Sequence, residues 1–303
     1  MFSVSQGRRG GFVLVSVLML GTVLVTSATA FAWFARMHAR STARERISLT
    51  NRSMAQVLAR AIIGYIEANA KENYDSLLQE WFEPFSFSSG ELGTWAVRVV
   101  PLDDKIPLRN LFLPDGSTLR SELRVVWEDM WVKLEQRELA PIVLDFFSRS
   151  TRPRMGGAQR DTHINRPPLD ISELLILEEM TPEILYGTPE TLGVADYCTL
   201  WSDGRINLNM APVHVVEILP GMNRSLAENI ANYRESRALT SMDDLSRIPG
   251  FPARVRAALM NVAGFASRYF MIKIDILEDG GGGTSFRVIF DKTVGEIVRW
   301  EEI

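Results

Sequence analysis

The sequence predicts an α+β fold in which a long N-terminal transmembrane helix packs on a small antiparallel sheet, and an all-helical region is inserted into that sheet. Three observations support this fold class. Residues 10–35 form an apolar run without a charge, which predicts the membrane helix. Apolar and polar residues alternate at 94–100 and again after residue 268, which predicts strands on both sides of the insertion. Between them, apolar residues recur at helical spacing around two Pro-Gly turns.

The apolar run is long enough to cross a membrane. Roughly 25 residues of helix extend about 37 Å, whereas a hydrocarbon core is about 30 Å thick. Arg8 and Arg9 precede the run, so the positive-inside rule predicts a cytoplasmic N-terminus and a chain that continues on the far side. Helical spacing persists beyond the run, without proline, to about Lys71. We therefore expect one helix over residues 12–71, apolar first and amphipathic afterwards.

Three interpretations of this N-terminal stretch remain open. It is a secretory signal cut after residues 28–30 (Ala-Thr-Ala), a plain membrane anchor, or a prepilin leader of residues 1–11 that is cut between Gly11 and Phe12. A signal peptide normally ends in an extended cleavage region, whereas this run passes directly into an amphipathic helix. The pattern therefore favours the prepilin leader.

Composition excludes several function classes. The 303 residues, 46% of them hydrophobic, allow two or three domains with a sizeable core. A net charge of -4 gives no general support for a nucleic-acid surface. Cys198 is the single cysteine, so no intrachain disulfide can form, and we interpret it as a small buried residue. His38, His163 and His214 lack metal-ligand spacing, and no catalytic motif occurs, so we expect neither a metal site nor an enzyme.

Residues 72–110 and 267–303 are predicted to form the two halves of one α/β layer. The first half has a strand near 94–100, followed by a turn at 103–105 that leads into the second strand of a hairpin at Ile106. The second half has strands on both sides of the glycine run 280–283, which predicts a flexible loop. We expect the C-terminal strands to pair with the strand at 94–100.

Residues 111–205 are predicted to form an inserted helical domain. An apolar stripe runs from about 119 to 146, and we expect Trp127 and Trp131 on it to be core residues. A loop at 150–168, rich in arginine, proline and glycine, follows this stripe.

Residues 206–266 carry the most specific pattern. Two hydrophobic-Pro-Gly turns, at 219–222 and 248–251, lie about 30 residues apart and indicate a helix-hairpin-helix (SAM-like) module. We expect Asn209 to cap the helix that begins near Ala211, with Pro212 in its first turn. The candidate structural residues of the module are Asn207, Asn209, Pro212, Pro220, Gly221, Pro249 and Gly250.

A helix-hairpin-helix module binds DNA in many proteins, because its hairpin amides hold a phosphate with help from Lys or Arg. The turns here offer Arg224 and Arg254, but Glu228, Asp243 and Asp244 lie close in sequence and the module contains no lysine. A membrane-anchored, competence-type DNA-binding protein is therefore the alternative function, and nucleic acid is not the partner that we expect.

The combination of these features resembles the K minor pseudopilins of type II secretion systems (the general secretion pathway protein K family). In most pilins and pseudopilins the fifth residue of the mature chain is glutamate. Counted from Phe12, that position holds Ser16, and K pseudopilins typically lack the glutamate too. Residues 206–212 resemble the family pattern I-N-x-N-T-A-P, with Met210 in place of threonine. The resemblance extends from Arg9 to Trp300 and implies a pilin-like fold.

The resemblance implies a non-enzymatic minor pseudopilin that caps the pseudopilus tip and helps initiate its assembly. The implied location is the cell inner membrane, with a single pass, a cytoplasmic N-terminus and most of the chain in the periplasm. Implied partners are the I-type and J-type minor pseudopilins, the major pseudopilin, the prepilin peptidase and the inner-membrane assembly platform. Leader removal and methylation of the new N-terminus are implied as well.

The resemblance also raises the possibility of calcium, because K pseudopilins carry acidic runs suited to oxygen coordination. This chain keeps Asp145. Other residues stand where carboxylates are expected, namely Phe146, Ser148, Ser150, Gln159 and Arg160. We therefore expect no calcium and no other cofactor.

Overall fold

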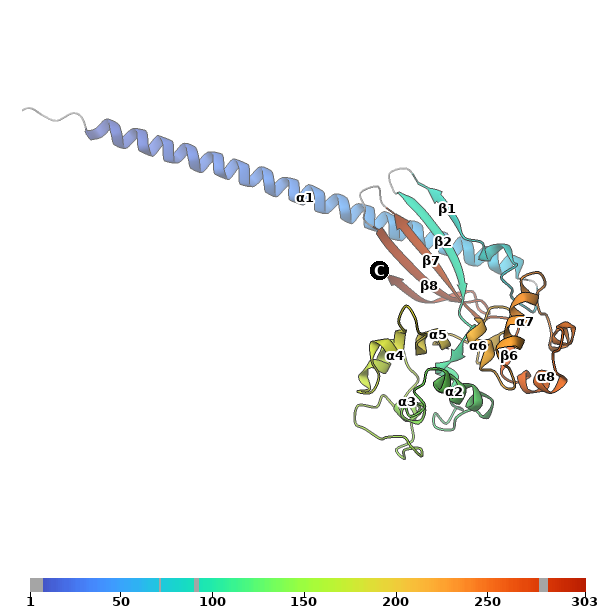
Figure 1. The fold of residues 1–303 in the computed structure, drawn as a ribbon. Helices are drawn as coiled ribbons and strands as arrows, with labels where there is room; N and C mark the ends of the chain where they lie inside the picture. The colour runs from blue at the N-terminus through green and yellow to red at the C-terminus, as the bar shows by residue number, and fades with distance from the viewer. Residues whose placement is uncertain (1–7, 71, 90–92, 278–282) are drawn as a thin grey trace, which may run out of the picture. The chain divides into compact units, whose positions relative to one another are not determined.

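The helix α1 (Arg8–Asn69) runs for 62 residues without a break, which confirms the predicted long helix (Figure 1). The computed structural model describes residues 8–70, 72–89, 93–277 and 283–303. Its contacts divide the chain into two units, one that extends to Val57 and one that comprises Leu58–Ile303. Residues 1–7 of the predicted leader (1–11) and the predicted end of the helix at Lys71 lie outside the described residues.

In the first unit the helix is apolar and exposed. The large hydrophobic side chains between Val13 and Phe34 leave most of their surface uncovered, and none of the most apolar window is buried. By length and composition, α1 can therefore cross a membrane.

The second unit contains a five-stranded antiparallel sheet in the order β1-β2-β7-β8-β9. Its strands come from two distant parts of the chain, as predicted, and β2 pairs with β7 through partners such as Val97 and Ile274. The last turns of α1, residues 58–69, lie along this sheet and bury Ile62 and Ile66 (Figure 1). The strands are β1 (Phe85–Ser88), β2 (Thr94–Pro101), β7 (Tyr269–Leu277), β8 (Gly283–Asp291) and β9 (Glu296–Glu302).

The predicted hairpin between the strand at 94–100 and Ile106 is wrong. The short strand β3 (Ile106–Pro107) pairs in parallel with β4 (Cys198–Thr199), outside the main sheet. Both sides of β2 are already occupied, by β1, which the sequence analysis missed, and by β7. The chain therefore leaves the sheet after β2. The predicted glycine loop lies outside the described residues, except for Gly283 at the start of β8.

The chain between β3 and β5 is helical, as predicted. The residues of its apolar stripe form two helices rather than one, because the chain turns at Glu135, which has a φ of 57°. Trp127 and Trp131 are buried, as expected of core residues. The elements are η1 (Glu80–Phe82) before the sheet, then η3 (Leu108–Asn110), α2 (Ser121–Lys133), α3 (Leu139–Phe147), η4 (Ile171–Ile176), α4 (Pro182–Tyr186) and α5 (Val194–Tyr197).

The helix-hairpin-helix module follows. Its two ends meet where β5 (Ile206–Asn207) pairs in parallel with β6 (Ala263–Gly264), so the module is closed at its base. Between these strands lie α6 (Val213–Glu217), α7 (Arg224–Arg234), η5 (Met242–Arg247) and α8 (Ala253–Leu259).

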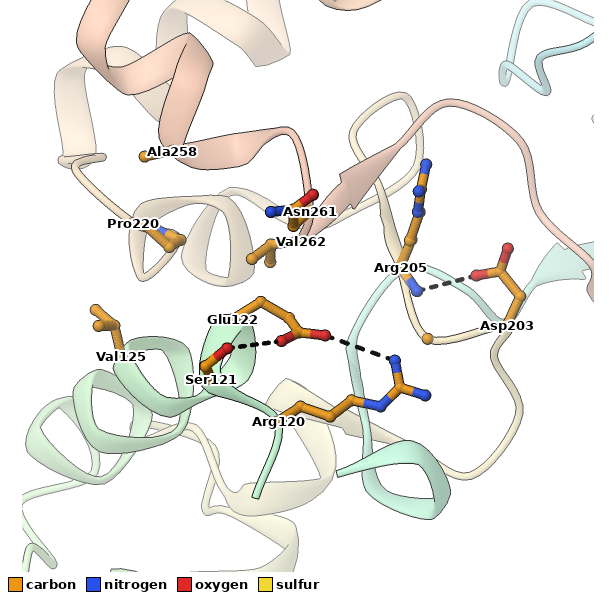
Figure 2. A pocket seen from close by; sticks show the side chains of 11 residues that line it. Arg120, Ser121, Glu122, Val125, Asp203, Arg205, Pro220, Ala258, Asn261 and Val262 are labelled. Atoms are coloured by element: carbon orange, nitrogen blue, oxygen red, sulfur yellow. Dashed lines mark hydrogen bonds and ion pairs between the residues drawn. The ribbon is translucent and has the colours of Figure 1, made fainter. Parts of the chain in front are cut away.

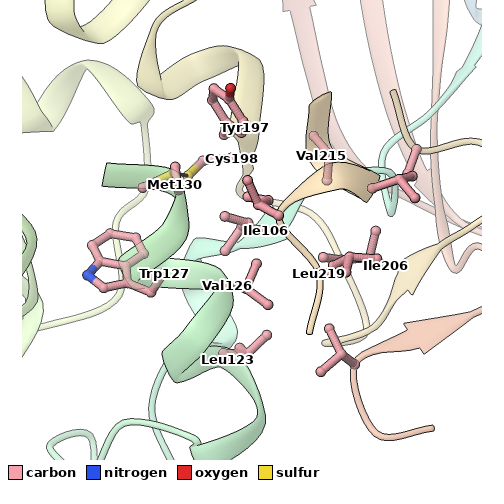
Figure 3. Close-up of a cluster of buried hydrophobic side chains, with 14 of the residues drawn as sticks. Ile106, Leu123, Val126, Trp127, Met130, Tyr197, Cys198, Ile206, Val215 and Leu219 are labelled. Carbon is pink, nitrogen blue, oxygen red and sulfur yellow. Dashed lines mark hydrogen bonds between the residues drawn. The ribbon is translucent and has the colours of Figure 1, made fainter. Parts of the chain in front are cut away.

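One hydrophobic core joins the inserted helices to the module. Figure 3 shows Val126 and Trp127 of α2 in the same cluster as Val215 and Leu219 of the module. The cluster contains residues from both sides of the predicted domain limit at 205/206. The predicted limit therefore does not coincide with a gap in the core, and it stays a prediction. Cys198 lies in this cluster, within 3.5 Å of the Met130 sulfur, and burial raises the pKa of its thiol. Cys198 is therefore a buried core residue, as interpreted.

Candidate functional site

The two Pro-Gly turns form the hairpins of the module. In the first turn (219–222), the last N–H donates to the first carbonyl at 2.9 Å and Gly221 has a φ of 75°. In the second turn (248–251), the same bond measures 3.2 Å and Gly250 has a φ of 73°. Proline presets the second position of such a turn, and a positive φ at the third favours glycine. Pro220, Gly221, Pro249 and Gly250 are thus the turn-forming residues.

Asn207 and Asn209 are buried and tie the module together. The Asn207 side-chain amide donates to Ser267 Oγ at 2.9 Å, and its carbonyl oxygen accepts the backbone N–H of Asn209 at 2.9 Å. The Asn209 side chain bonds both the N–H and the carbonyl of Leu239 at 2.8 Å. The predicted helix cap by Asn209 is therefore wrong, because its side chain is committed to residue 239. The N-cap residue of α6 is Pro212, which precedes the first turn rather than lying in it.

An ion pair whose carboxylate is buried lies beside Asn207. Lys292 Nζ, in the turn between β8 and β9, contacts both carboxylate oxygens of Asp75 at 2.7 and 2.5 Å. The backbone N–H of Ser267 donates to the same carboxylate at 2.7 Å. Asn207 also donates to the Asp75 carbonyl at 3.4 Å. These contacts join the segment after α1, the module and the sheet at one point.

Asp103 forms a second buried junction, at the end of β2. Its carboxylate accepts three backbone N–H groups at 2.8 Å each, from Asp203, Arg268 and Tyr269. The Asp103 carbonyl also accepts the N–H of Asn207 at 2.7 Å. Burial raises the pKa of the Asp103 carboxyl to about 7, against the opposing effect of these donors. The Asp75 and Asp103 contacts together form a polar junction that fixes the module to the sheet.

Most arginines of the module are engaged inside it. Arg234 is partly buried and donates to the carbonyls of Leu208 and Ala211 at 2.7 and 2.6 Å, and burial lowers its pKa. Arg224 pairs with Glu228 at 2.6 Å. Two further pairs are Arg247–Asp244 and Arg256–Asp243. Of the arginines in the predicted phosphate-binding turns, only Arg254 is exposed without a carboxylate partner among the described residues. This arrangement provides little free positive charge for a nucleic acid.

A cleft of about 550 Å³ separates the N-terminal end of α2 from the module. Figure 2 shows two contacts within its lining: Arg120 pairs with Glu122 at 3.6 Å, and Asp203 accepts the backbone N–H of Arg205 at 2.9 Å. Asn261 and Val262 face it from the module. The Ser121 hydroxyl donates to the Glu122 carboxylate at 3.2 Å, and the same carboxylate pairs with Arg120.

The loop that follows α3 places an arginine next to Asp145, where the family resemblance suggested a calcium site. The buried carboxylate of Asp145 accepts the backbone N–H of Arg154 at 2.9 Å and pairs with its guanidinium at 2.6 Å. The same guanidinium donates to the Ser117 carbonyl at 2.5 Å. Within residues 8–70, 72–89, 93–277 and 283–303, no group of three His, Cys, Asp or Glu residues is placed to hold a metal. Asp145 thus has an arginine as its counter-ion.

The N-terminal candidates all lie in α1. Gly11 and Phe12 are within the helix, which begins at Arg8, and Ser16 is an exposed residue of its apolar half. A protease that reads an extended backbone would have to open this first turn. These residues belong to the first unit, whereas the module residues belong to the second.

The polar junction was missed by sequence reasoning. Asp75, Asp103 and Lys292 lie in three separate connecting segments. A turn rich in aspartate signals a bend at 103–105, but no local pattern shows which backbone amides it will bind. Only the fold brings these residues together.

Comparisons with known proteins agree with this architecture. A family model described as the helix-hairpin-helix motif matches residues 202–267, which confirms the predicted module. No curated protein matches the sequence. Among solved structures, the chain is similar to GspK in the crystal structure of the GspK-GspI-GspJ complex from the enterotoxigenic Escherichia coli type 2 secretion system. That match has a TM-score of 0.64 and 16% identity, and it covers 88% of this chain and 99% of that chain. The chain therefore has the fold of that GspK, with the predicted α+β class and the inserted helical region.

Proposed function

We propose that this protein is a K-type minor pseudopilin of a type II secretion system. The observation that carries the proposal is the fold likeness to GspK over nearly the whole of both chains. The apolar helix α1, which is long enough to cross a membrane, supports it independently. Under this proposal the chain acts by assembly rather than by catalysis.

The proposed mechanism begins at the membrane. The prepilin peptidase removes residues 1–11, the new amine of Phe12 is methylated, and α1 stays in the inner membrane with the second unit in the periplasm. The chain then assembles with the I-type and J-type minor pseudopilins, as GspK does with GspI and GspJ in the solved complex. The major pseudopilin and the assembly platform extend the fibre below it.

Position 16 supports a place at the tip. A glutamate in lipid is retained where a neighbouring amine neutralises it, and Ser16 cannot form such a pair. A subunit without this contact is suited to start a fibre rather than to be added beneath an existing one. The bulky second unit, Leu58–Ile303, would cap the fibre.

A direct test is co-purification of the full-length chain with its cognate I-type and J-type subunits from membranes. The proposal expects a ternary complex, and deletion of the chain should reduce pseudopilus formation. A full-length chain that is stable in the membrane but binds neither subunit would contradict the proposal.

The match to the helix-hairpin-helix motif supports one alternative, a membrane-anchored DNA-binding protein. It requires free cationic groups at the hairpins, whereas the module's arginines are mostly engaged with its own carboxylates and carbonyls. We expect no salt-dependent binding of duplex DNA by the full chain in detergent. Binding that weakens steeply with salt and is lost in Arg254→Ala would favour the alternative instead.

A further inference from the structure

The sheet ends in two edge strands that are protected very differently. β9 carries four charged residues among its seven, and Arg299 on it donates to the Leu169 carbonyl at 3.2 Å and pairs with Asp170 at 3.3 Å. β1 has the sequence Phe-Ser-Phe-Ser, without charge or proline. In the described part of the chain, β1 is hydrogen-bonded only to β2. An edge strand exposes unpaired N–H and C=O groups that can pair with another strand. The charged residues and the contacts of Arg299 protect β9 against such pairing, whereas β1 has no such protection within the described residues and is the open edge.

The open edge carries exposed aromatic rings on one face. The pairing register puts Phe85 opposite Val97 and Phe87 opposite Trp95, so both rings lie on the buried face of β2. Phe87 stacks on Trp95 with ring centroids 5.9 Å apart, and Phe85 stacks on Phe87 at 6.5 Å. Phe85 is nevertheless 46% exposed and Phe87 36%. The core of the sheet therefore continues outward to an uncovered edge.

An apolar groove of about 280 Å³ lies beside these rings, between the last turns of α1 and the edge. Its apolar lining includes Ile62, Tyr65 and Val99. Acidic groups flank it: Glu80 accepts the Tyr65 hydroxyl at 3.0 Å, and the exposed Glu83 has no ion-pair partner among the described residues. Such a groove suits apolar side chains with a positive charge at one end.

We propose that β1 accepts an extended strand of a partner protein, which lengthens the sheet by main-chain hydrogen bonds. The partner strand places apolar side chains at alternate positions against Phe85, Phe87 and the groove, and a Lys or Arg beside Glu83. The unpaired backbone of β1 specifies an extended occupant, because only a strand pairs with a strand edge. Four residues of β1 span about 13 Å, so this contact is one part of a larger interface. The proposal concerns a binding edge and does not depend on the secretion role.

The test is hydrogen exchange of the full chain in detergent micelles, followed by mass spectrometry, with the synthetic peptide Lys-Val-Thr-Val-Thr-Val as the probe. At saturating peptide, exchange in residues 84–89 should slow by at least about tenfold, while exchange in 296–302 should not change. A control peptide with aspartate in place of valine should have no effect. Unchanged exchange at 84–89, or equal slowing at both edges, would overturn the proposal.

Variants keep the test specific to the edge. Phe87→Lys should abolish the slowing, and Ser86→Lys, which removes no aromatic contact, should weaken it by adding a charge to the open edge. Val298→Lys on β9 is the matched control and should retain it. If both β1 variants respond to the peptide like the unmodified chain, the proposal is wrong. Slow exchange at 84–89 that depends on protein concentration alone would show that a second copy covers the edge, and would overturn it as well.

Discussion

Asp75 shows how much of the fold depends on single buried charges. Its carboxylate is fully buried and is neutralised by Lys292, with one further donor from the Ser267 backbone. Taking two charges out of water is costly, so such a pair adds little net stability, but removal of one partner leaves the other charge buried and unpaired. The pair therefore matters most for how precisely it joins three segments.

We predict that Lys292→Met lowers the free energy of unfolding by about 3 to 5 kcal/mol. The double variant with Asp75→Asn should recover part of this loss, because it removes the orphaned charge. Lys273→Met is the control: its pair with Asp275 is substantially exposed, so the loss should be under about 1 kcal/mol. Denaturant unfolding of the full chain in detergent measures all three. Equal losses for Lys292→Met and Lys273→Met would contradict the role of burial.

Asp103 makes stability depend on pH. Burial raises the pKa of its carboxyl from its ordinary value near 4 to about 7, so between these pH values the folded chain binds a proton that the unfolded chain does not. The protonation of Asp103 therefore adds to the free energy of unfolding at low pH, and this contribution is lost as the pH rises from about 4 to about 7.

We predict that Asp103→Asn removes this pH dependence. The three N–H groups bind both carboxylate oxygens of Asp103, whereas the side chain of asparagine has only one oxygen and its nitrogen cannot accept a hydrogen bond. The variant should therefore be less stable at every pH. The stability difference, unmodified chain minus variant, should shrink from pH 4 to pH 7 and stay constant above. Asp104, whose pKa burial raises to about 6, is present in both proteins and cancels in the difference. A difference that stays constant or grows over this range would contradict a raised pKa of the Asp103 carboxyl.

At the level of elements, the two Pro-Gly turns offer a matched comparison. Gly221 and Gly250 both have a positive φ, so an alanine costs about 1 to 2 kcal/mol of backbone strain at either position. A Cβ at 221 would in addition lie 3.3 Å from Val255 Cγ2, whereas a Cβ at 250 has nothing within 4 Å. We predict that Gly221→Ala lowers the thermal unfolding midpoint more than Gly250→Ala. An equal or reversed order would contradict the packing of the first turn against α8.

The elements that the sequence predicts well are those with a local cause. The alternation at 94–100 and after 268 identifies β2 and β7, because one face of each of these strands is buried. The Pro-Gly turns identify the module, because Pro and Gly restrict the backbone locally. β1 was missed although Phe-Ser-Phe-Ser alternates, because the run is only four residues long and lies between Pro84 and a Ser-Gly turn signal.

The errors arise where a distant contact outcompetes a local one. Asn209 follows the pattern of a helix cap, yet its side chain bonds Leu239, thirty positions away. Ile106 was expected in a hairpin with β2, but β1 and β7 already fill both sides of that strand. Neither the Asp75 nor the Asp103 junction has a local signature, so that part of the candidate site could not be predicted from sequence.

At the scale of the whole molecule, an apolar helix and a large head of sheet and helices are carried by one chain. α1 provides the membrane-spanning length, and Leu58–Ile303 provides a five-stranded sheet into which the helical region is inserted. This combination, rather than any catalytic group, underlies the proposed assembly function. The state of the N-terminus decides whether the chain enters the membrane as a pilin-class subunit.

The most direct measurement is therefore the mature N-terminus of the chain in its native membrane, determined by mass spectrometry with the cognate prepilin peptidase present and deleted. We predict a methylated chain that begins at Phe12 when the peptidase is present, and an uncut chain that begins at Met1 when it is deleted. A chain that begins at Phe31 in both strains would be a secreted protein cut after Ala30. That result, or an uncut Met1 in both strains, would contradict the assignment as a pseudopilin.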